Sequence, residues 1–233
     1  MGLINSLKAS KAAGTVKRII NISSGSAYGD GGFGDTGWDG VLDEYGTRED
    51  PVSLYAISKF ASERIARRLG NLMSLDICNV RLSAIFGPWE YDTGLRDTIS
   101  APMQASLLAI AGSTAILSRK ESRDWTYSRH VAEALYALMD QKKLTHDLYN
   151  ITSGMPWSVE EWCKCLAKTF PEFQYRFARA REQANVDLFG DRDRVTMSSE
   201  KLTGDTGYEL SKNILEIYKN FEDWILSSRE FWK

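Results

Sequence analysis

The feature that most constrains the fold is the alternation of apolar β-branched runs with amphipathic helical segments. Residues 18–23, Arg-Ile-Ile-Asn-Ile-Ser, form a continuous run that is typical of a strand buried on both faces. Residues 53–72 predict a long helix, because an apolar stripe recurs there at every fourth residue with charges between: Ile57, Ala61, Ile65 and Leu69. Residues 75–82 return to a strand pattern. Strands that alternate with helices predict an α/β fold with a largely parallel sheet.

The rest of the chain continues this alternation. Helices are expected at 3–13, 98–111, 128–141, 158–170 and 211–231, and strands at 115–118, 148–152 and 173–178. The helix at 158–170 opens with a capping box, Ser158-Val159-Glu160-Glu161. We expect a domain boundary near Gly87-Pro88, with one domain over 1–88 and a second, mixed α/β domain over 89–233. Segments around 128–152 are expected to return to the first domain.

Composition argues against several classes of protein. The chain has 233 residues, a net charge of −2 and no strongly basic stretch, so nucleic-acid binding is not expected. It contains no run of about 18 apolar residues, so no membrane-spanning helix is expected. Three cysteines without a C-x-x-C pair and two histidines argue against a structural zinc site and favour reduced thiols in the cytoplasm. Metals bound by carboxylates stay open.

Three residues form a candidate catalytic set. Tyr55 and Lys59 are four residues apart on the predicted helix, so they share one helix face. An isolated tyrosine ionises only near pH 10, and a lysine cation one turn away favours the phenolate. That pair suits general acid/base chemistry. Ser24 follows the strand at 18–23, at the carboxyl end where ligands bind in open α/β sheets.

These residues stand in motifs that resemble the extended short-chain dehydrogenase/reductases, the family of NAD-dependent sugar epimerases and dehydratases. The matching motifs occur in the family's order and span most of the chain: Ser23-Ser24-Gly25-Ser26-Ala27-Tyr28-Gly29, Tyr55-Ala56-Ile57-Ser58-Lys59 with Glu63, Arg81, Phe86-Gly87-Pro88-Trp89, Arg123-Asp124-Trp125-Thr126-Tyr127 and Tyr149-Asn150-Ile151. The resemblance implies part of a Rossmann-type, doubly wound parallel sheet with a smaller mixed α/β substrate-binding domain.

The resemblance also implies a role for each matching residue. Ser24 would hydrogen-bond the substrate and Tyr55 would be the acid/base. Lys59 would hold the ribose next to the nicotinamide of NAD, or of NADP. Arg123 would grip the diphosphate of a nucleotide-sugar, for which a planar guanidinium is suited. The alternative for Arg123 is a surface ion pair with a neighbouring acid. For Arg81, which closes its strand, the alternative is an ion pair with a local carboxylate.

Several positions depart from the family's pattern. Gly25 and Ser26 stand where the dehydratases carry an acidic pair, so dehydration is disfavoured. Ala84 replaces an asparagine that is frequent in sugar-nucleotide enzymes, which weakens that assignment. Arg129 and His130 replace an aspartate pair before the following helix.

The largest departure is at the start of the chain. The family opens with a strand, a G-x-x-G-x-x-G turn and a helix that binds the pyrophosphate. Here the sequence begins in the helix before the family's fourth strand, so the first three strands have no counterpart and we expect an N-terminally truncated member. The run Gly29–Gly34 imitates G-x-G-x-x-G, but no helix follows it, and we interpret it as a loop over the active site.

The function expected from these observations is epimerisation at a sugar or nucleotide-sugar carbon through hydride transfer to NAD(P) and back. One alternative is a simple dehydrogenase or reductase of a hydroxyl or aldehyde. Another is a non-catalytic fragment that keeps Ser24, Tyr55 and Lys59 but does not bind the cofactor. The resemblance further implies a homodimer in the full-length protein, formed by two long helices of each subunit.

Overall fold

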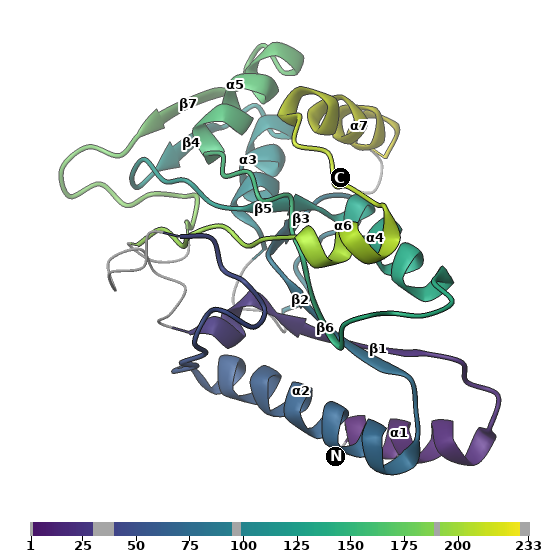
Figure 1. The fold of residues 1–233 in the computed structure, drawn as a ribbon. Coiled ribbons are helices and arrows are strands. Elements are labelled where there is room, and N and C mark those ends of the chain that lie inside the picture. Colours follow the sequence, from purple (N-terminus) through teal and green to yellow (C-terminus); the bar gives the residue numbers. More distant parts are fainter. Residues whose placement is uncertain (1, 30–39, 95–98, 189–191, 229–233) are drawn as a thin grey trace. The chain divides into compact units, whose positions relative to one another are not determined.

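The computed structural model describes residues 2–29, 40–94, 99–188 and 192–228 of the chain (Figure 1). The helices are α1 (Gly2–Ala13), the 3-10 helix η1 (Gly25–Tyr28), α2 (Leu54–Met73), α3 (Ala101–Ile110), α4 (Ser128–Asp140), α5 (Val159–Thr169), α6 (Glu200–Thr206) and α7 (Ile214–Ser227). The strands are β1 (Ile19–Ser24), β2 (Ile77–Leu82), β3 (Ala84–Phe86), β4 (Thr114–Leu117), β5 (Trp125–Tyr127), β6 (Leu148–Ile151) and β7 (Gln174–Phe177).

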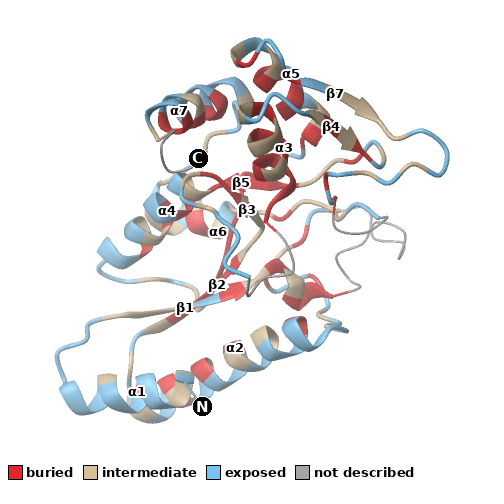
Figure 2. Ribbon diagram, turned by 180° about the vertical axis from the view of Figure 1, so that it is seen from behind, coloured by how far each residue is buried: buried red, intermediate tan, exposed pale blue. Residues whose placement is uncertain are grey.

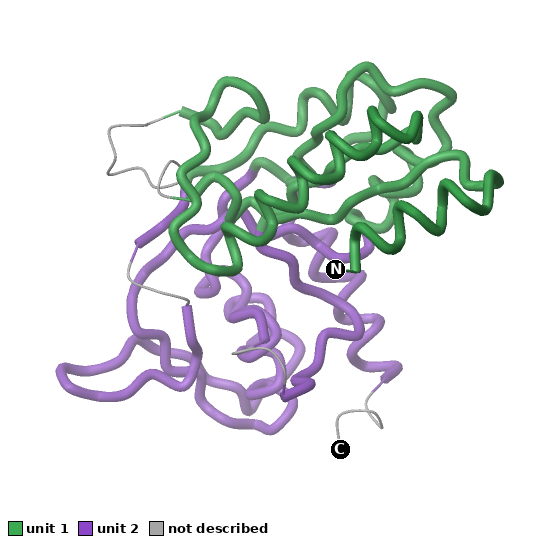
Figure 3. Tube along the Cα trace, turned by 90° about the horizontal axis from the view of Figure 1, so that it is seen from below, with its two compact units in different colours: residues 1–83, 130–154, 195–210 green, residues 84–129, 155–194, 211–233 purple. Residues whose placement is uncertain are grey.

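The chain divides into two compact units that are interleaved in sequence (Figure 3). The first unit contains residues 1–83, 130–154 and 195–210, and the second contains residues 84–129, 155–194 and 211–233. Each unit is therefore assembled from three separate stretches of the chain, and each is described by itself.

A three-stranded parallel sheet in the order β1-β2-β6 organises the first unit. Helices α1 and α2 lie along one face of this sheet, and α4 and α6 lie on the other (Figure 1). Figure 2 shows that the middle strand β2 is largely buried, whereas α1 and α2 keep an exposed side. All three strands run in the same direction, so their carboxyl ends meet at one edge of the unit.

Local sequence explains where α2 begins and how closely it approaches the sheet. The Ser53 side chain accepts a hydrogen bond from the backbone N–H of Ala56 and caps the helix. The buried residues of α2 are Ala56, Glu63, Ala66 and Gly70, most of which are small. A Cβ atom on Gly70 would lie 3.0 Å from the Ile77 Cδ1 atom, so the small residues allow the helix to lie close to β2.

The apolar stripe that predicted α2 is not its buried face. Ile57 is 45% exposed and Ile65 is 38% exposed, and Ala61 is exposed as well. Most of the stripe therefore faces away from the sheet that the small residues touch, so an apolar surface stays open to solvent. The helix itself is confirmed, but the face that the sequence pattern points to is not the one packed in this unit.

The second unit has two separate pairs of parallel strands, β3-β5 and β4-β7. Its core is rich in aromatic side chains, and Trp162 contacts Phe86, Tyr218 and Phe221 edge-to-face with ring centroids 5.1 Å apart in each pair. Helices α3, α5 and α7 carry much of the rest of this core. The capping box at Ser158 and Glu161 is present as expected and begins α5.

The α/β class and the parallel sheet are confirmed, and most predicted elements match to within a few residues. The sequence analysis missed β3, β5 and α6, and α7 begins at Ile214 rather than near residue 211. Residues 30–34 of the glycine-rich run lie outside the described residues. Among the helices that the structure describes, none is long and apolar enough to cross a bilayer.

Candidate active site at the carboxyl end of β1

Ser24 is the last residue of β1, where the chain turns into η1. It pairs with Leu82, the last residue of β2, in the parallel ladder. The Ser24 Oγ atom accepts a hydrogen bond from the backbone N–H of Ser26 at 3.1 Å and caps η1. Because this bond uses the hydroxyl as an acceptor, its hydrogen remains available to a ligand oxygen. The residue is half-buried at the edge of the sheet where ligands bind in open α/β folds.

Tyr55 lies in the first turn of α2, and Lys59 lies in the second. Tyr55 is 56% exposed, so its phenol is open to a ligand. The Lys59 Nζ atom donates a hydrogen bond to the Ile22 carbonyl oxygen at 3.1 Å and lies 5.8 Å from the centroid of the Tyr55 ring. The ammonium group therefore sits beside the phenol and holds α2 against β1, two residues before Ser24.

A close approach of the chain fixes the entry into α2. Gly29 ends η1 with a φ of 58°, and a Cβ atom there would lie 1.6 Å from the Asp50 carbonyl oxygen. The Asp50 N–H donates to the Tyr28 carbonyl oxygen at 3.1 Å. Only glycine fits this contact, which brings the residues just before α2 back to the residues just after β1.

The arrangement at Lys59 fits one part of a nicotinamide dinucleotide. An ammonium group has three donors, and the Ile22 carbonyl oxygen takes one of them, so two remain for ribose hydroxyls. The exposed Tyr55 phenol is available on the same helix face. In the part of the chain that the structure describes, no strand leads through a G-x-x-G-x-x-G turn into an α-helix.

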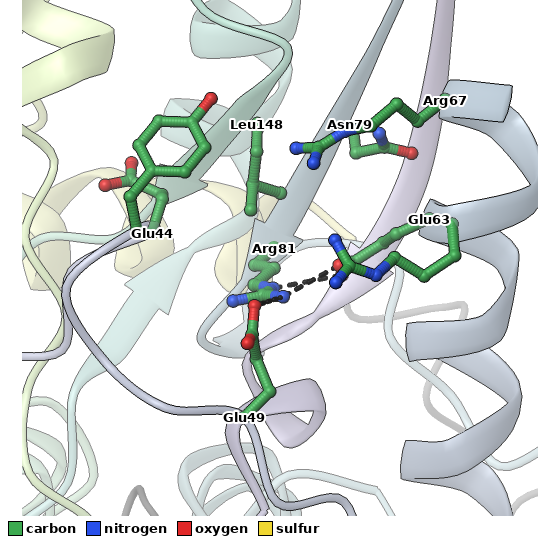
Figure 4. Close-up of a pocket in the computed structure, with 9 residues that line it drawn as sticks. Glu44, Glu49, Glu63, Arg67, Asn79, Arg81 and Leu148 are labelled. Atoms are coloured by element: carbon green, nitrogen blue, oxygen red, sulfur yellow. Dashed lines mark hydrogen bonds and ion pairs between the residues drawn. The ribbon is translucent and has the colours of Figure 1, made fainter.

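Arg81 and Glu63 form a buried ion pair in the first unit (Figure 4). Arg81 is fully buried, and its Nε and Nη2 atoms donate to the two carboxylate oxygens of Glu63 at 3.0 and 2.7 Å. Its Nη2 atom also donates to Glu49 at 3.0 Å. The Ser23 hydroxyl donates to Glu63 Oε1 at 2.5 Å. The alternative considered for Arg81, an ion pair with a local carboxylate, is therefore what the structure has.

Electrostatics within this cluster favour the ionised arginine. Burial alone would lower the pKa of Arg81, but the hydrogen bonds and the charge of Glu63 outweigh burial and raise it. Arg81 also lies over the ring of Tyr28, with 4.4 Å between the guanidinium carbon and the ring centroid. Burial raises the pKa of Tyr28 to about 12, so this tyrosine stays neutral beside the cation.

A cavity of about 180 Å³ opens next to Arg81 (Figure 4). Its lining is mostly polar and comes from α2, β2, β6 and the segment before α2: Glu44, Tyr45, Glu49, Glu63, Arg64, Arg67, Asn79, Arg81 and Leu148. The Arg81 Nη1 atom is buried and lacks a hydrogen-bond partner among the described residues. A polar cavity of this size next to an unsatisfied donor is suited to ordered water.

Arg123 belongs to the second unit and precedes β5. Its backbone forms an antiparallel bridge with Trp157, with N–H···O distances of 3.2 and 3.1 Å. Its guanidinium donates to the Leu188 carbonyl oxygen at 3.1 Å and lies 5.2 Å from the ring centroid of Trp125. Burial lowers the pKa of Arg123, which opposes its charge, and the nearby Glu121 carboxylate acts in the other direction.

Two acidic residues near the candidate site residues were given no role by the sequence alone. Glu121 is 8% exposed, and its carboxylate accepts a hydrogen bond at 2.7 Å from the N–H of Val159 at the start of α5. Burial raises the pKa of Glu121. Glu63 stood out only as part of a family motif, although its spacing from Tyr55 and Lys59 places all three on one face of α2. Within the described residues, no group of three or more histidine, cysteine or acidic side chains is placed to hold a metal.

Comparison with known proteins places this site in a family. Residues 1–152 match the NAD dependent epimerase/dehydratase family, and because the match covers more than half of the chain, the chain belongs to that family. Over 233 residues the chain is 24% identical to a trifunctional UDP-glucose 4,6-dehydratase, 3,5-epimerase and reductase of Arabidopsis thaliana, with 97% of this chain and 32% of the relative covered. The chain thus spans about a third of the length of that curated relative.

Solved structures of low sequence identity share the fold. An epimerase of Methanothermobacter thermautotrophicus superposes with a TM-score of 0.78 at 19% identity, with 99% of this chain and 65% of that chain covered. The UDP-glucose 4-epimerase of Thermotoga maritima, solved with UDP-glucose, has a TM-score of 0.76 at 19% identity over 98% of this chain and 69% of that chain. A dTDP-glucose 4,6-dehydratase of Bacillus anthracis, solved with NAD, has a TM-score of 0.73 at 20% identity over 99% and 68%.

Proposed function

We propose that this member of the NAD-dependent epimerase/dehydratase family supplies the acid/base residues and the substrate-binding unit of an enzyme that acts on a sugar or nucleotide-sugar by reversible hydride transfer. The observation that carries the proposal is the placement of Lys59: its ammonium group lies beside the Tyr55 ring and is bound to β1 two residues before Ser24. Hydroxyl, phenol and ammonium are thereby attached to one end of a parallel sheet.

Each of the three residues has a chemical task in this proposal. The Ser24 hydroxyl, which accepts from Ser26, donates its hydrogen to the reacting substrate oxygen and orients it. Tyr55 removes the proton of the substrate hydroxyl and later returns it, with the Lys59 ammonium 5.8 Å from the centroid of its ring. When NAD(P) is bound, its nicotinamide takes up and returns the hydride. The two free donors of Lys59 orient the adjacent ribose.

The substrate class is proposed from the second unit and from the relatives. Arg123 lies over Trp125 with a carbonyl oxygen on one side, which holds a planar donor suited to phosphate oxygens. The curated relatives at 31–33% identity over 88 residues are UDP-glucuronate 4-epimerases, which act on a nucleotide-sugar by name. Gly25 and Ser26 in place of an acidic pair disfavour dehydration, so epimerisation is preferred.

The test of the mechanism is Tyr55→Phe in the protein with its NAD site complete. Turnover should fall by about 10²-fold or more, the scale of a general acid/base contribution, with little change in thermal stability because the side chain is exposed. Tyr136→Phe is the matched control, since Tyr136 is 70% exposed on α4 and should leave turnover unchanged. Turnover near that of the unsubstituted protein in Tyr55→Phe would remove Tyr55 from the mechanism.

The behaviour of the cofactor distinguishes epimerisation from the two alternative functions. Epimerisation returns the hydride, so the absorbance of the reduced cofactor stays at a low steady level during turnover. A simple dehydrogenase or reductase of a hydroxyl or aldehyde instead changes that absorbance steadily. Equilibrium dialysis of residues 1–233 against NAD tests the third alternative, a catalytically inactive chain that does not bind cofactor.

The role of Arg123 has its own test. Arg123→Ala should weaken competition by a nucleoside diphosphate by about tenfold or more, because a charged hydrogen-bond donor is lost, while NAD affinity stays constant. Arg176→Ala is the control, because the Arg176 guanidinium forms an exposed pair with Glu182 at 2.6 Å in the same unit. Equal competition against the Arg123→Ala and unsubstituted proteins would contradict the diphosphate assignment.

We also propose a cytoplasmic homodimer without nucleic-acid or membrane partners. The three cysteines are free and buried, which suits a reducing compartment. The open apolar stripe of α2, together with Leu54 at 87% and Leu72 at 62% exposure, supports pairing of this helix with a second subunit. Light scattering at several concentrations tests the dimer, and a monomer throughout would contradict it.

A further inference from the structure

Glu63 shares a helix face with Tyr55 and Lys59 but differs from them in burial. The three residues recur at every fourth position of α2. Tyr55 is exposed and Lys59 half-buried, whereas Glu63 is only 4% exposed. A buried carboxylate is costly unless its oxygens are hydrogen-bonded, and both oxygens of Glu63 are.

Two consecutive residues of β1 are bound by this one face of α2. The Ile22 carbonyl oxygen accepts from Lys59, and the Ser23 hydroxyl donates to Glu63 at 2.5 Å. The next residue along the strand is Ser24. These two bonds therefore set how far α2 is shifted along β1 immediately before the serine, and with it where Tyr55 lies relative to Ser24.

Arg81 extends the same contact to the neighbouring strand. In the parallel ladder Arg81 is the direct partner of Ser23, so Glu63 meets adjacent residues on β1 and β2. The second carboxylate on Arg81, Glu49, belongs to the segment that leads into α2. One guanidinium thus joins the strand, the helix and the approach to the helix (Figure 4).

We propose that Glu63 is a positioning residue: held by Arg81, it binds Ser23 and fixes the register between the helix that carries Tyr55 and Lys59 and the strand that ends in Ser24. This inference rests on the proposed function. A buried ion pair is often no more stabilising than a well-packed apolar pair, so stability alone does not account for a charged cluster here. Directional hydrogen bonds can fix the register of α2 along β1, and an apolar pair cannot.

The double substitution Glu63→Met/Arg81→Met separates positioning from stability. It removes one charge of each sign and keeps the volume apolar, so the melting temperature should stay within a few degrees of that of the unsubstituted protein. Turnover should nevertheless fall between about tenfold and 10²-fold at an unchanged KM, because small displacements of reacting groups have effects of that size. Ser23→Ala keeps the ion pair and should show a smaller loss of turnover in the same direction.

A second measurement needs neither cofactor nor substrate. Tetranitromethane nitrates phenolates, and peptide mass spectrometry reports the extent at Tyr55 in residues 1–233. When the register loosens, the Lys59 ammonium leaves its fixed place beside the ring, so the extent of Tyr55 nitration at a fixed pH should differ from that of the unsubstituted protein in both variants. Arg67→Gln is the matched control: Arg67 is one turn further along α2 and pairs with Asp147 at 2.6 Å, so its loss should lower the melting temperature without changing the extent of Tyr55 nitration.

The outcomes that overturn the proposal are distinct from failure of the proposed function. A folded double variant with the turnover and the extent of Tyr55 nitration of the unsubstituted protein would show that the cluster is only structural. If the double variant does not fold, an unchanged extent of Tyr55 nitration in Ser23→Ala would equally show that Glu63 does not set the register. Failure of Tyr55→Phe to reduce turnover would refute the mechanism while leaving the nitration result to decide whether Glu63 sets the register.

Discussion

The two edges of the β1-β2-β6 sheet are built very differently. Strand β6 is an edge strand, yet all four of its residues are buried, at 4% exposure for Leu148 and 0% for the other three. Its outer side is covered by residues 41–44 and by the segment after residue 195. The Asn150 N–H donates to Glu44 at 2.8 Å, and its side chain donates to the Leu42 carbonyl oxygen at 3.2 Å.

Strand β1 has the more apolar sequence but the more open position. Only Ser23 of its six residues is buried, and Ile22 is 38% exposed. Among the described residues β1 pairs with β2 alone, so its other backbone edge faces no strand. The apolar stripe of α2 is left open in the same unit.

This difference indicates what each edge is for. In the doubly wound order 3-2-1-4-5-6, the strands β1, β2 and β6 match the last three positions, and strand 1 would lie beside β1. That strand carries the turn that binds the pyrophosphate of a dinucleotide. The edge at β6 is covered by other residues of this chain. The open edge at β1 is where we expect the cofactor-binding strands of the family to pair.

The largest effect should follow from leaving the β1 edge open. We expect residues 1–233 alone to show no NAD binding and to self-associate, because an exposed apolar edge strand pairs with other chains. Ile22→Lys should reduce this association, since a charge on an edge strand opposes pairing, while Leu148→Lys should prevent folding because β6 is buried. Size-exclusion chromatography, thermal melting and NAD titration measure these effects.

A single result would break the comparison. If residues 1–233 are monodisperse, melt cooperatively and bind NAD with micromolar affinity, the β1 edge needs no further strand and its placement beside strand 1 is wrong. If Ile22→Lys and the unsubstituted chain associate equally, the contact that drives association lies elsewhere on the molecule.

Much of this fold was predictable from local sequence. Three local patterns each predict an element that the structure contains: the β-branched run before Ser24, the regular spacing of apolar residues along α2 and the capping box at Ser158. By contrast β3 and β5 have three residues each and, within the described part of the chain, pair only with one another, so neither carries an alternating pattern long enough to be recognised. Helix α6 has seven residues, of which Gly204 and two threonines are weak helix formers.

The residues of the candidate site could be predicted from the sequence, but the hydrogen bonds that join them to one another could not. The spacing of Tyr55 and Lys59 indicates a shared face, and the hydrogen bond from Lys59 to the Ile22 carbonyl oxygen attaches that face to β1 two residues before Ser24. The contacts of Glu63 are different, because they join residues 40 and 18 positions away in the sequence. No local pattern encodes such pairing, and it emerges only when β1 and β2 are placed side by side. The same is true of the residues that close the β6 edge.

Asn150 on β6 and Asn21 on β1 form a matched pair that compares the two edges of the sheet. Asn150→Ala on β6 should lower the free energy of unfolding by about 2–4 kcal/mol, because it leaves the Tyr28 hydroxyl and the Leu42 carbonyl without their buried partner. Asn21→Ala on β1 removes bonds to Asn79 at 2.8 Å and Ser62 at 3.4 Å in a half-exposed place, and should cost about 1 kcal/mol or less. Urea unfolding at neutral pH compares the two, and equal losses would contradict the contrast between the edges.

The smallest effect concerns the ion pairs that hold the cover of β6. Lys201 donates to Asp43 at 2.5 Å and to Glu44 at 2.9 Å. Burial by itself would raise the pKa of Asp43, but the bonds from Lys201 and from two backbone N–H groups lower it to about 2. A carboxylate whose pKa is lower in the folded than in the unfolded protein stabilises the fold at pH values above its unfolded-state pKa. It loses that contribution as the pH falls toward 2.

Lys201→Met should therefore lower the free energy of unfolding by about 1–2 kcal/mol at neutral pH. The share from Asp43 is limited to about 1 kcal/mol, because that side chain is 41% exposed. The difference in unfolding free energy between Lys201→Met and the unsubstituted protein should be constant above about pH 4 and shrink as the pH falls toward 2. Lys164→Met removes an exposed pair with Glu160 on α5 and serves as the control, with no such change. A difference that grows on acidification would show that Lys201 does not act through Asp43.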